Sequence, residues 1–61
     1  MTFIAKLQNT QETFDFLKDP DNFFGDFYIN IEDGHTVSVE FEIEEDCVFA
    51  VDCLGGTLKG N

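Results

Sequence analysis

The chain has 61 residues, and thirteen Asp and Glu against three Lys and no Arg give it a formal net charge of -10 at pH 7. A charge of this sign excludes a conventional nucleic-acid-binding footprint and disfavours anionic membranes, so any partner is expected to be basic. The chain is not a disordered acidic tail, because 43% of its residues are hydrophobic and the apolar positions recur periodically.

A chain of this length predicts a single domain over 1–61, with marginal stability because so small a fold buries only about 60% of the unfolded surface. Eight Phe supply large apolar areas to compensate. No run approaches the roughly 20 apolar residues of a membrane helix, and no signal peptide is recognisable, so the expected location is the cytoplasm. No cofactor is expected.

Residues 2–8 allow two interpretations. Phe3, Ala5 and Leu7 alternate as in a strand, whereas Phe3 and Leu7 also continue the apolar spacing of the next segment as one long helix. Asn9 resembles an N-cap, with the carboxylate of Glu12 three residues later. We therefore expect a strand followed by a helix from about Thr10 to Lys18, ending before Asp19-Pro20.

The segment Phe27 to Leu54 predicts a three-stranded antiparallel meander, because apolar residues alternate at period two and breaks fall at Asp33-Gly34 and at Glu44-Glu45-Asp46. Matching apolar faces gives the first hairpin a three-residue loop, Glu32-Asp33-Gly34, with Gly34 left-handed. The expected cross-strand pairs are Ile31 with His35, Ile29 with Val37, Phe27 with Val39, Ile43 with Cys47, Phe41 with Phe49, and Val39 with Val51.

The predicted fold is therefore α+β, in the order β-α-β-β-β, with one helix packed on an antiparallel sheet. The folded core is expected over about 2–54, and residues 55–61 are expected to be a flexible tail. The predicted core residues are Phe3, Leu7, Phe14, Leu17, Phe27, Ile29, Ile31, Val37, Val39, Phe41, Ile43, Phe49 and Val51.

Carboxylates gather on the outward side of the predicted meander. Their clustering costs stability through repulsion unless a cationic partner relieves it. Three interpretations are open: a solvated face that keeps a small protein soluble, a site for a basic partner, or adaptation to high salt. The candidate partner-binding residues are Glu32, Glu40, Glu42, Glu44, Glu45, Asp46 and Asp52.

A second candidate contact is apolar. Tyr28, Val48, Ala50 and Leu54 share the predicted outer sheet face and would form one patch there, suited to a homodimer or another partner. A structural or assembly subunit that uses this patch is the alternative function, with the acidity then serving solubility alone.

Catalytic and metal sites are not expected. Asp19, Asp21, Asn22 and Asp26 resemble hard-cation ligands, but Phe24 stands where a calcium loop needs its glycine. His35 has no nucleophile to activate, and the chain is too short to enclose a pocket of the usual ~300 Å³. Cys47 and Cys53, about 20 Å apart on one predicted strand, are too distant for a disulfide. They are expected to be small core hydrophobes in a reducing cytoplasm, with an intermolecular disulfide as the alternative.

Small size, strong acidity, aromatic content and an α+β pattern together resemble the phage-encoded inhibitor proteins that include anti-CRISPR proteins and DNA mimics. The resemblance covers the whole chain, is compositional, and carries over no functional residue. It implies a protein that occupies a positively charged nucleic-acid channel on a host defence complex. We therefore expect a protein-binding inhibitor or nucleic-acid mimic, not an enzyme, that docks its acidic sheet face on a basic protein surface.

Overall fold

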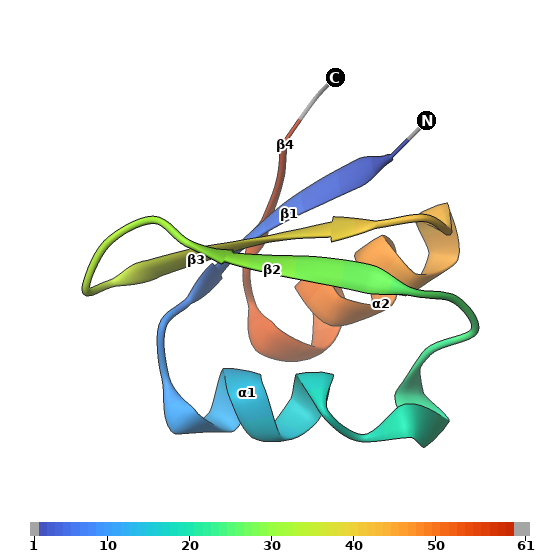
Figure 1. Ribbon diagram of the computed structural model, residues 1–61, viewed down its shortest axis with the longest axis horizontal. Helices are drawn as coiled ribbons and strands as arrows, with labels where there is room; N and C mark the ends of the chain where they lie inside the picture. Colours follow the sequence, from blue (N-terminus) through green and yellow to red (C-terminus); the bar gives the residue numbers. More distant parts are fainter. Residues whose placement is uncertain (1, 60–61) are drawn as a thin grey trace.

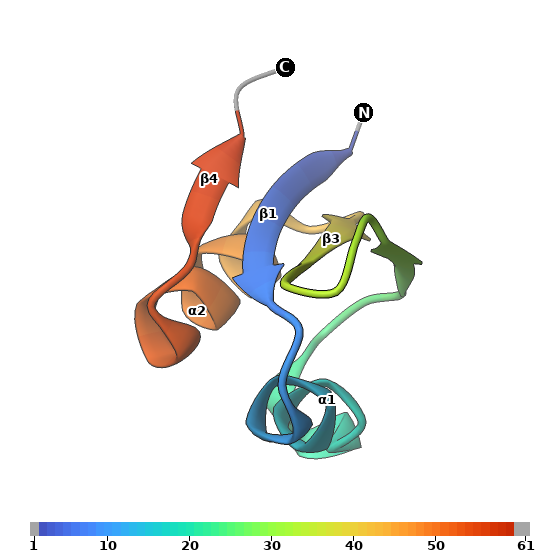
Figure 2. The ribbon, with the colours of Figure 1, turned by 90° about the vertical axis from the view of Figure 1, so that its left-hand side faces the viewer.

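The computed structural model describes residues 2–59 and has the predicted α+β class. The elements in chain order are β1 (Phe3–Gln8), α1 (Gln11–Leu17), the short 3-10 helix η1 (Pro20–Asn22), β2 (Phe27–Ile31), β3 (Thr36–Phe41), α2 (Glu44–Leu54) and β4 (Thr57–Lys59). The four strands form one antiparallel sheet in the order β2-β3-β1-β4 (Figure 1). Both helices lie on the same side of this sheet (Figure 2), so its other face is open.

The first segment is a strand followed by a helix, as expected. Helix α1 is capped by Thr10 rather than by Asn9, because the Thr10 hydroxyl accepts a hydrogen bond from the Thr13 N–H at 3.3 Å. Asn9 instead donates its side-chain amide to the Asp33 carbonyl at 3.1 Å. The residue predicted as the cap therefore joins the end of β1 to the β2–β3 loop.

The β2–β3 hairpin keeps the predicted faces but shifts the register by two residues. Ile31 pairs with Val37, Ile29 with Val39 and Phe27 with Phe41. The expected pairs were therefore wrong, and so was a left-handed Gly34, since Gly55 is the one described residue with positive φ. The turn is closed by Asp33, whose Oδ1 accepts from the N–H groups of His35 and Thr36 at 2.7 and 2.8 Å.

The same two backbone N–H groups hold the pKa of the Asp33 carboxyl below its usual value, with the bond from His35 contributing most. The turn therefore stabilises the ionised form of the Asp33 carboxyl. Because the Asp33 side chain closes the turn, no left-handed glycine is needed. His35 remains in the loop, since its N–H is bonded to Asp33 instead of to β2.

The third strand of the predicted meander is a helix. Residues 44–54 form α2, so the expected pairs of Ile43 with Cys47, Phe41 with Phe49 and Val39 with Val51 do not exist. The three carboxylates at 44–46 lie in the first turn of α2, where negative charge is stabilised by the positive end of the helix dipole. Gly55, at φ 70°, ends the helix by donating its N–H to the Val51 carbonyl at 2.8 Å.

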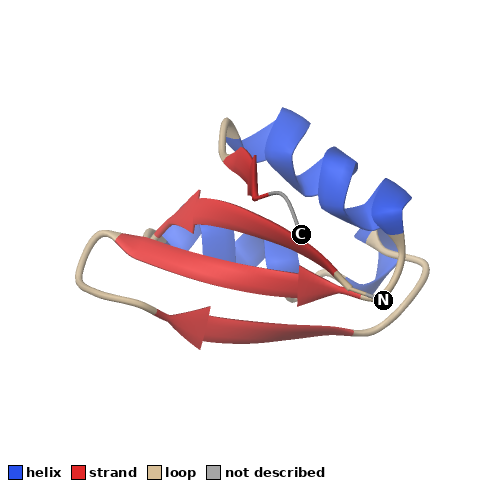
Figure 3. Ribbon diagram, turned by 90° about the horizontal axis from the view of Figure 1, so that it is seen from above, coloured by secondary structure: helices blue, strands red, loops and turns tan. Residues whose placement is uncertain are grey.

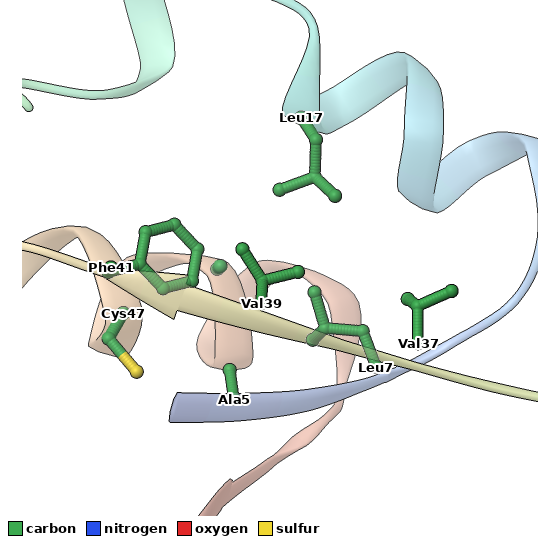
Figure 4. Packing of buried hydrophobic residues seen from close by; sticks show 8 residues of the cluster. Ala5, Leu7, Leu17, Val37, Val39, Phe41 and Cys47 are labelled. Atoms are coloured by element: carbon green, nitrogen blue, oxygen red, sulfur yellow. The ribbon is translucent and has the colours of Figure 1, made fainter. Parts of the chain in front are cut away.

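The core lies between the sheet and the two helices (Figure 4). The predicted residues Leu7, Leu17, Val37, Val39 and Phe41 are buried, and they are joined by Ala5, Cys47 and Ala50, which the prediction omitted. Phe3, Phe14, Phe27, Ile43 and Val51 are half-buried.

Three predicted core residues are exposed instead. Ile29 and Ile31 are 38% and 66% exposed on the edge strand β2, and Phe49 is 41% exposed on α2. The prediction failed at β2 because the helices cover the middle of the sheet, and the α2 contacts fall on β1, β3 and β4. The prediction failed at Phe49 because residues 44–54 form a helix and not the predicted strand.

Part of the expected C-terminal tail is ordered in the sheet. Strand β4 pairs with β1, with Leu58 opposite Ala5, and residues 60 and 61 lie outside the described residues. Gly56 makes the close approach that this pairing needs, since a Cβ there would lie 2.4 Å from the Lys6 carbonyl oxygen. A side chain at position 56 would therefore force β4 away from β1.

We expect Phe41→Ala to lower the free energy of unfolding by roughly 3 to 5 kcal/mol, because Phe41 is fully buried on a central strand. Urea denaturation measures the change. The matched control is Ile31→Ala on β2, whose side chain is 66% exposed and should cost far less. A loss below about 1 kcal/mol for Phe41→Ala would contradict this core.

Candidate functional site

The structure disperses the predicted acidic set. Glu42, Glu44 and Glu45 lie together and exposed at the start of α2. Glu40 lies on the open face of the sheet, and Asp52 is exposed in the second half of α2.

Two of the predicted partner-binding carboxylates are already engaged within the protein. Glu32, at the opposite end of β2, forms an ion pair with Lys6. Asp46 is only 1% exposed, so it cannot present its charge to a partner. The acidic set is therefore not one row along a strand, and Asp46 has a structural role.

The open sheet face is mixed in charge rather than acidic. Its first row across the strands reads Tyr28, Glu40, Ile4 and Lys59. Lys6 occupies the next row. Because two of the three lysines of the chain stand here, the prediction of an acidic sheet face was wrong, and the strongest acidic clustering lies elsewhere.

Asp46 fixes the segment that precedes β2. Its Oδ1 accepts from the Phe24 N–H at 3.0 Å, and its Oδ2 accepts from the Phe24 and Gly25 N–H groups at 3.2 and 2.9 Å. Both carboxylate oxygens are thus satisfied by backbone donors, which is how a buried charge becomes tolerable. A Cβ at position 25 would lie 2.7 Å from Ile43 Cδ1, so any larger residue there would require the Ile43 side chain to shift.

The two aromatic residues of this segment, Phe23 and Phe24, point in opposite directions. Phe23 turns inward, with its ring centroid 5.2 to 5.6 Å from those of Phe16, Phe27 and Phe41. Phe24 turns outward and is 84% exposed. Phe16 and Phe23 are thus part of one ring cluster, and Phe24 is held at the surface because its N–H is bonded to the Asp46 carboxylate.

Phe24 lies between two shallow hollows rimmed by carboxylates. One hollow, of about 360 Å³, is lined by Phe24 and Phe49 together with Asp21 and Glu45. The other, of about 500 Å³, is lined by Phe24 and Phe27 together with the carboxylates of Asp19 and Asp26 and the single cation of Lys18. The backbone of Glu42 lies beside Asp26, because the Glu42 N–H donates to the Asp26 carbonyl at 3.2 Å.

We call this region the acidic-aromatic surface and define it by Phe24, Phe49, Asp21, Asp26, Glu42 and Glu45. The predicted partner-binding set included two of its residues, Glu42 and Glu45, but not the other four. A signal was present in Phe23-Phe24, two adjacent aromatics in an irregular segment. One of them faces solvent because the ring cluster accommodates the other.

The predicted apolar patch does not exist as one surface. Ala50 is fully buried and Leu54 half-buried against the core. Tyr28 and Val48 are exposed but belong to different layers, since Tyr28 is on the open sheet face and α2 covers the other face. These four residues cannot form a common dimer contact.

Among residues 2–59, no group of three or more His, Cys, Asp or Glu is placed to hold a metal ion. His35 is exposed in the β2–β3 loop. Neither described helix has the length and apolar character needed to cross a bilayer.

The two cysteines lie on α2, not on a strand as predicted. Cys47 is buried in the core, while Cys53 is exposed, and both are free thiols. Burial raises the pKa of the Cys47 thiol, and the charge of Glu44 acts in the same direction. Cys47 is therefore an unreactive core residue.

Comparison of the chain with family models, with curated proteins and with solved structures gave no match. The acidic-aromatic surface must therefore be interpreted from its own chemistry.

We expect Asp46→Asn to cost roughly 1.5 to 3 kcal/mol of stability, because the amide loses the charge and faces backbone donors with one NH₂ group. The amide signals of Phe24 and Gly25 should shift most in an NMR spectrum. Glu45→Gln, the same change of charge at the exposed neighbouring position, is the control. Equal stability losses in both variants would contradict the structural role of Asp46.

Proposed function

We propose that this protein is a small acidic binding protein that docks its acidic-aromatic surface on a basic surface of another protein. The observation that supports this most directly is Phe24, which is 84% exposed while its backbone N–H is bonded to a buried carboxylate. A large apolar side chain in water gains nothing for the isolated domain, whereas it would gain from burial in a partner.

Phe24 has the properties of a binding anchor. Burying an aromatic side chain removes about 150 to 250 Å² of apolar surface from water. The bonds to Asp46 fix the backbone before binding, which reduces the entropy lost on association. Anchors of this kind in the centre of an interface commonly contribute most of the affinity.

The surrounding carboxylates would select the partner. Asp21, Asp26, Glu42 and Glu45 are all exposed, and like charges so close together repel one another unless a cationic surface neutralises them. The net charge of -10 would also steer a basic partner toward the protein over distances set by ionic strength.

Basic surfaces of this kind are typical of nucleic-acid-handling proteins, where they contact phosphates. The proposed role is therefore inhibition by occupying such a surface, the action expected of the phage-encoded inhibitors and DNA mimics that the composition resembles. The identity of the partner, including a CRISPR-type defence protein, is part of the proposal. The function as an assembly subunit loses support, since its apolar patch is not formed.

A matched pair of charge reversals tests the site. We expect Glu42→Lys to weaken partner binding at least tenfold and Asp52→Lys to weaken it only slightly, although each changes the net charge by two units. Both side chains are exposed, but the backbone of Glu42 lies beside Asp26 and Asp52 lies in the second half of α2. Equal losses would mean that the charge acts only as a diffuse field.

The partner for this measurement comes from capture on the immobilised protein. Proteins retained from a host lysate at low salt should be nucleic-acid-binding proteins that duplex DNA or high salt releases. Phe24→Ala should reduce their affinity roughly thirtyfold, as loss of about 2 kcal/mol implies. Partners that resist both DNA and salt, or that bind Phe24→Ala as well as the unchanged protein, would contradict the proposal.

A further inference from the structure

Strand β2 ends the sheet, and its outer edge is uncovered (Figure 3). The hydrogen bonds to β3 fix which of its backbone groups are free. The Glu32 N–H donates to the Thr36 carbonyl, and the Glu42 N–H donates to the Asp26 carbonyl. The even-numbered residues along β2 therefore bond to β3. In an antiparallel ladder the bonded positions alternate. The N–H and C=O groups of Phe27, Ile29 and Ile31 therefore point toward the open edge.

This edge lacks the features that usually protect an exposed strand. Its sequence over residues 27–31 has no charge and no proline. The side chains of Ile29 and Ile31 are 38% and 66% exposed on the same side of the sheet as the helices. Edge strands with free backbone groups and apolar side chains are templates for pairing with another strand. The opposite edge, β4, has only three residues and includes Lys59.

The charges that flank β2 decide what can pair with it. Asp26 precedes the strand and Glu32 follows it, and both are exposed. Glu32 is paired with Lys6 but keeps 38% of its side chain exposed, so Asp26 carries the less compensated of the two charges. If a second copy paired antiparallel about Ile29, Asp26 of each chain would lie opposite Glu32 of the other, and two chains of charge -10 would meet. Like charges directly opposite are destabilising. A strand with basic residues at both flanks would instead be attracted at both ends.

The edge is continuous with the acidic-aromatic surface. Phe27, the first residue of β2, lines the same hollow as Phe24 and Asp26. A strand that pairs with β2 would therefore extend at one end toward Phe24 and its carboxylates, and at the other toward Glu32.

We propose that β2 binds an extended segment of a basic partner by strand addition. The segment would have apolar residues at alternate positions, opposite Phe27, Ile29 and Ile31, and basic residues opposite Asp26 and Glu32. Main-chain bonds would supply affinity, and the alternating side chains would supply specificity. The inference rests on the proposed function only for the basic character of the partner.

The test uses the synthetic peptide Lys-Val-Thr-Val-Thr-Val-Lys, titrated into ¹⁵N-labelled protein. We expect saturable shifts of the Phe27, Ile29 and Ile31 amides. Ile29→Pro should weaken binding at least tenfold, because it removes an outward N–H that β3 does not use, and proline is tolerated on edge strands. The peptide Glu-Val-Thr-Val-Thr-Val-Glu should bind at least tenfold more weakly. Shifts confined to other elements, or none at millimolar peptide, would overturn the proposal.

A second pair of variants covers the event that Ile29→Pro does not fold. Ile31→Asp interrupts the apolar row and should weaken binding of the basic peptide, although it adds an attractive charge. Asn30→Asp adds the same charge on the other face and should not weaken it. Equal effects, or a sedimentation mass that rises to a dimer through the β2 edge, would overturn strand addition by a basic partner.

These outcomes separate the two proposals. Capture of salt-sensitive basic proteins without peptide binding at β2 would refute strand addition and leave the proposed function standing. Peptide binding at β2 without capture of salt-sensitive basic proteins would refute the proposed function and leave strand addition standing.

Discussion

The hydrogen bonds that the N–H groups of Phe24 and Gly25 donate to the Asp46 carboxylate connect the two parts of the chain that determine the acidic-aromatic surface. They hold the irregular segment before β2 against the first turn of α2. A charge that is 1% exposed would be costly without these donors, so the segment and the helix end stabilise each other. The position of Phe23 in the core and of Phe24 in solvent follows from this arrangement.

A small domain has little stability to spare, and this chain places repelling carboxylates and an exposed aromatic side by side. Only the core beneath them offsets that cost. Phe23 lies within 6.4 Å of four other rings, measured between centroids, and so connects α1, β2, β3 and α2. The aromatic content of the sequence therefore serves two purposes: it forms a packed ring cluster, and it supplies the exposed side chains of Phe24 and Phe49.

Much of the fold was predictable from periodicity, and the errors have identifiable causes. Period two correctly gave β2 and β3 and the residues on each face, because a slip of two residues preserves parity. At the end of the chain, apolar residues at 47, 49, 51 and 53 fit a strand, while those at 47, 50, 51 and 54 fit a helix equally well. The acidic first turn and Gly55 favoured the helix.

The candidate site was less predictable than the fold. Glu42 and Glu45 were identified from their charge, but charge alone could not distinguish them from Asp46, whose burial depends on a segment some twenty positions away in the chain. The exposure of Phe24 and the open edge of β2 are likewise consequences of which surfaces the two helices cover. Such information arises only from the three-dimensional arrangement.

The most direct test of this arrangement is backbone ¹⁵N relaxation at Phe24 and Gly25. If the Asp46 carboxylate fixes the segment, both amides should have order parameters of about 0.85, as rigid as those of α2, although the Phe24 side chain is exposed. Order parameters below about 0.6 at these two amides would show a flexible loop, and would contradict the presentation of Phe24 as a pre-positioned binding residue.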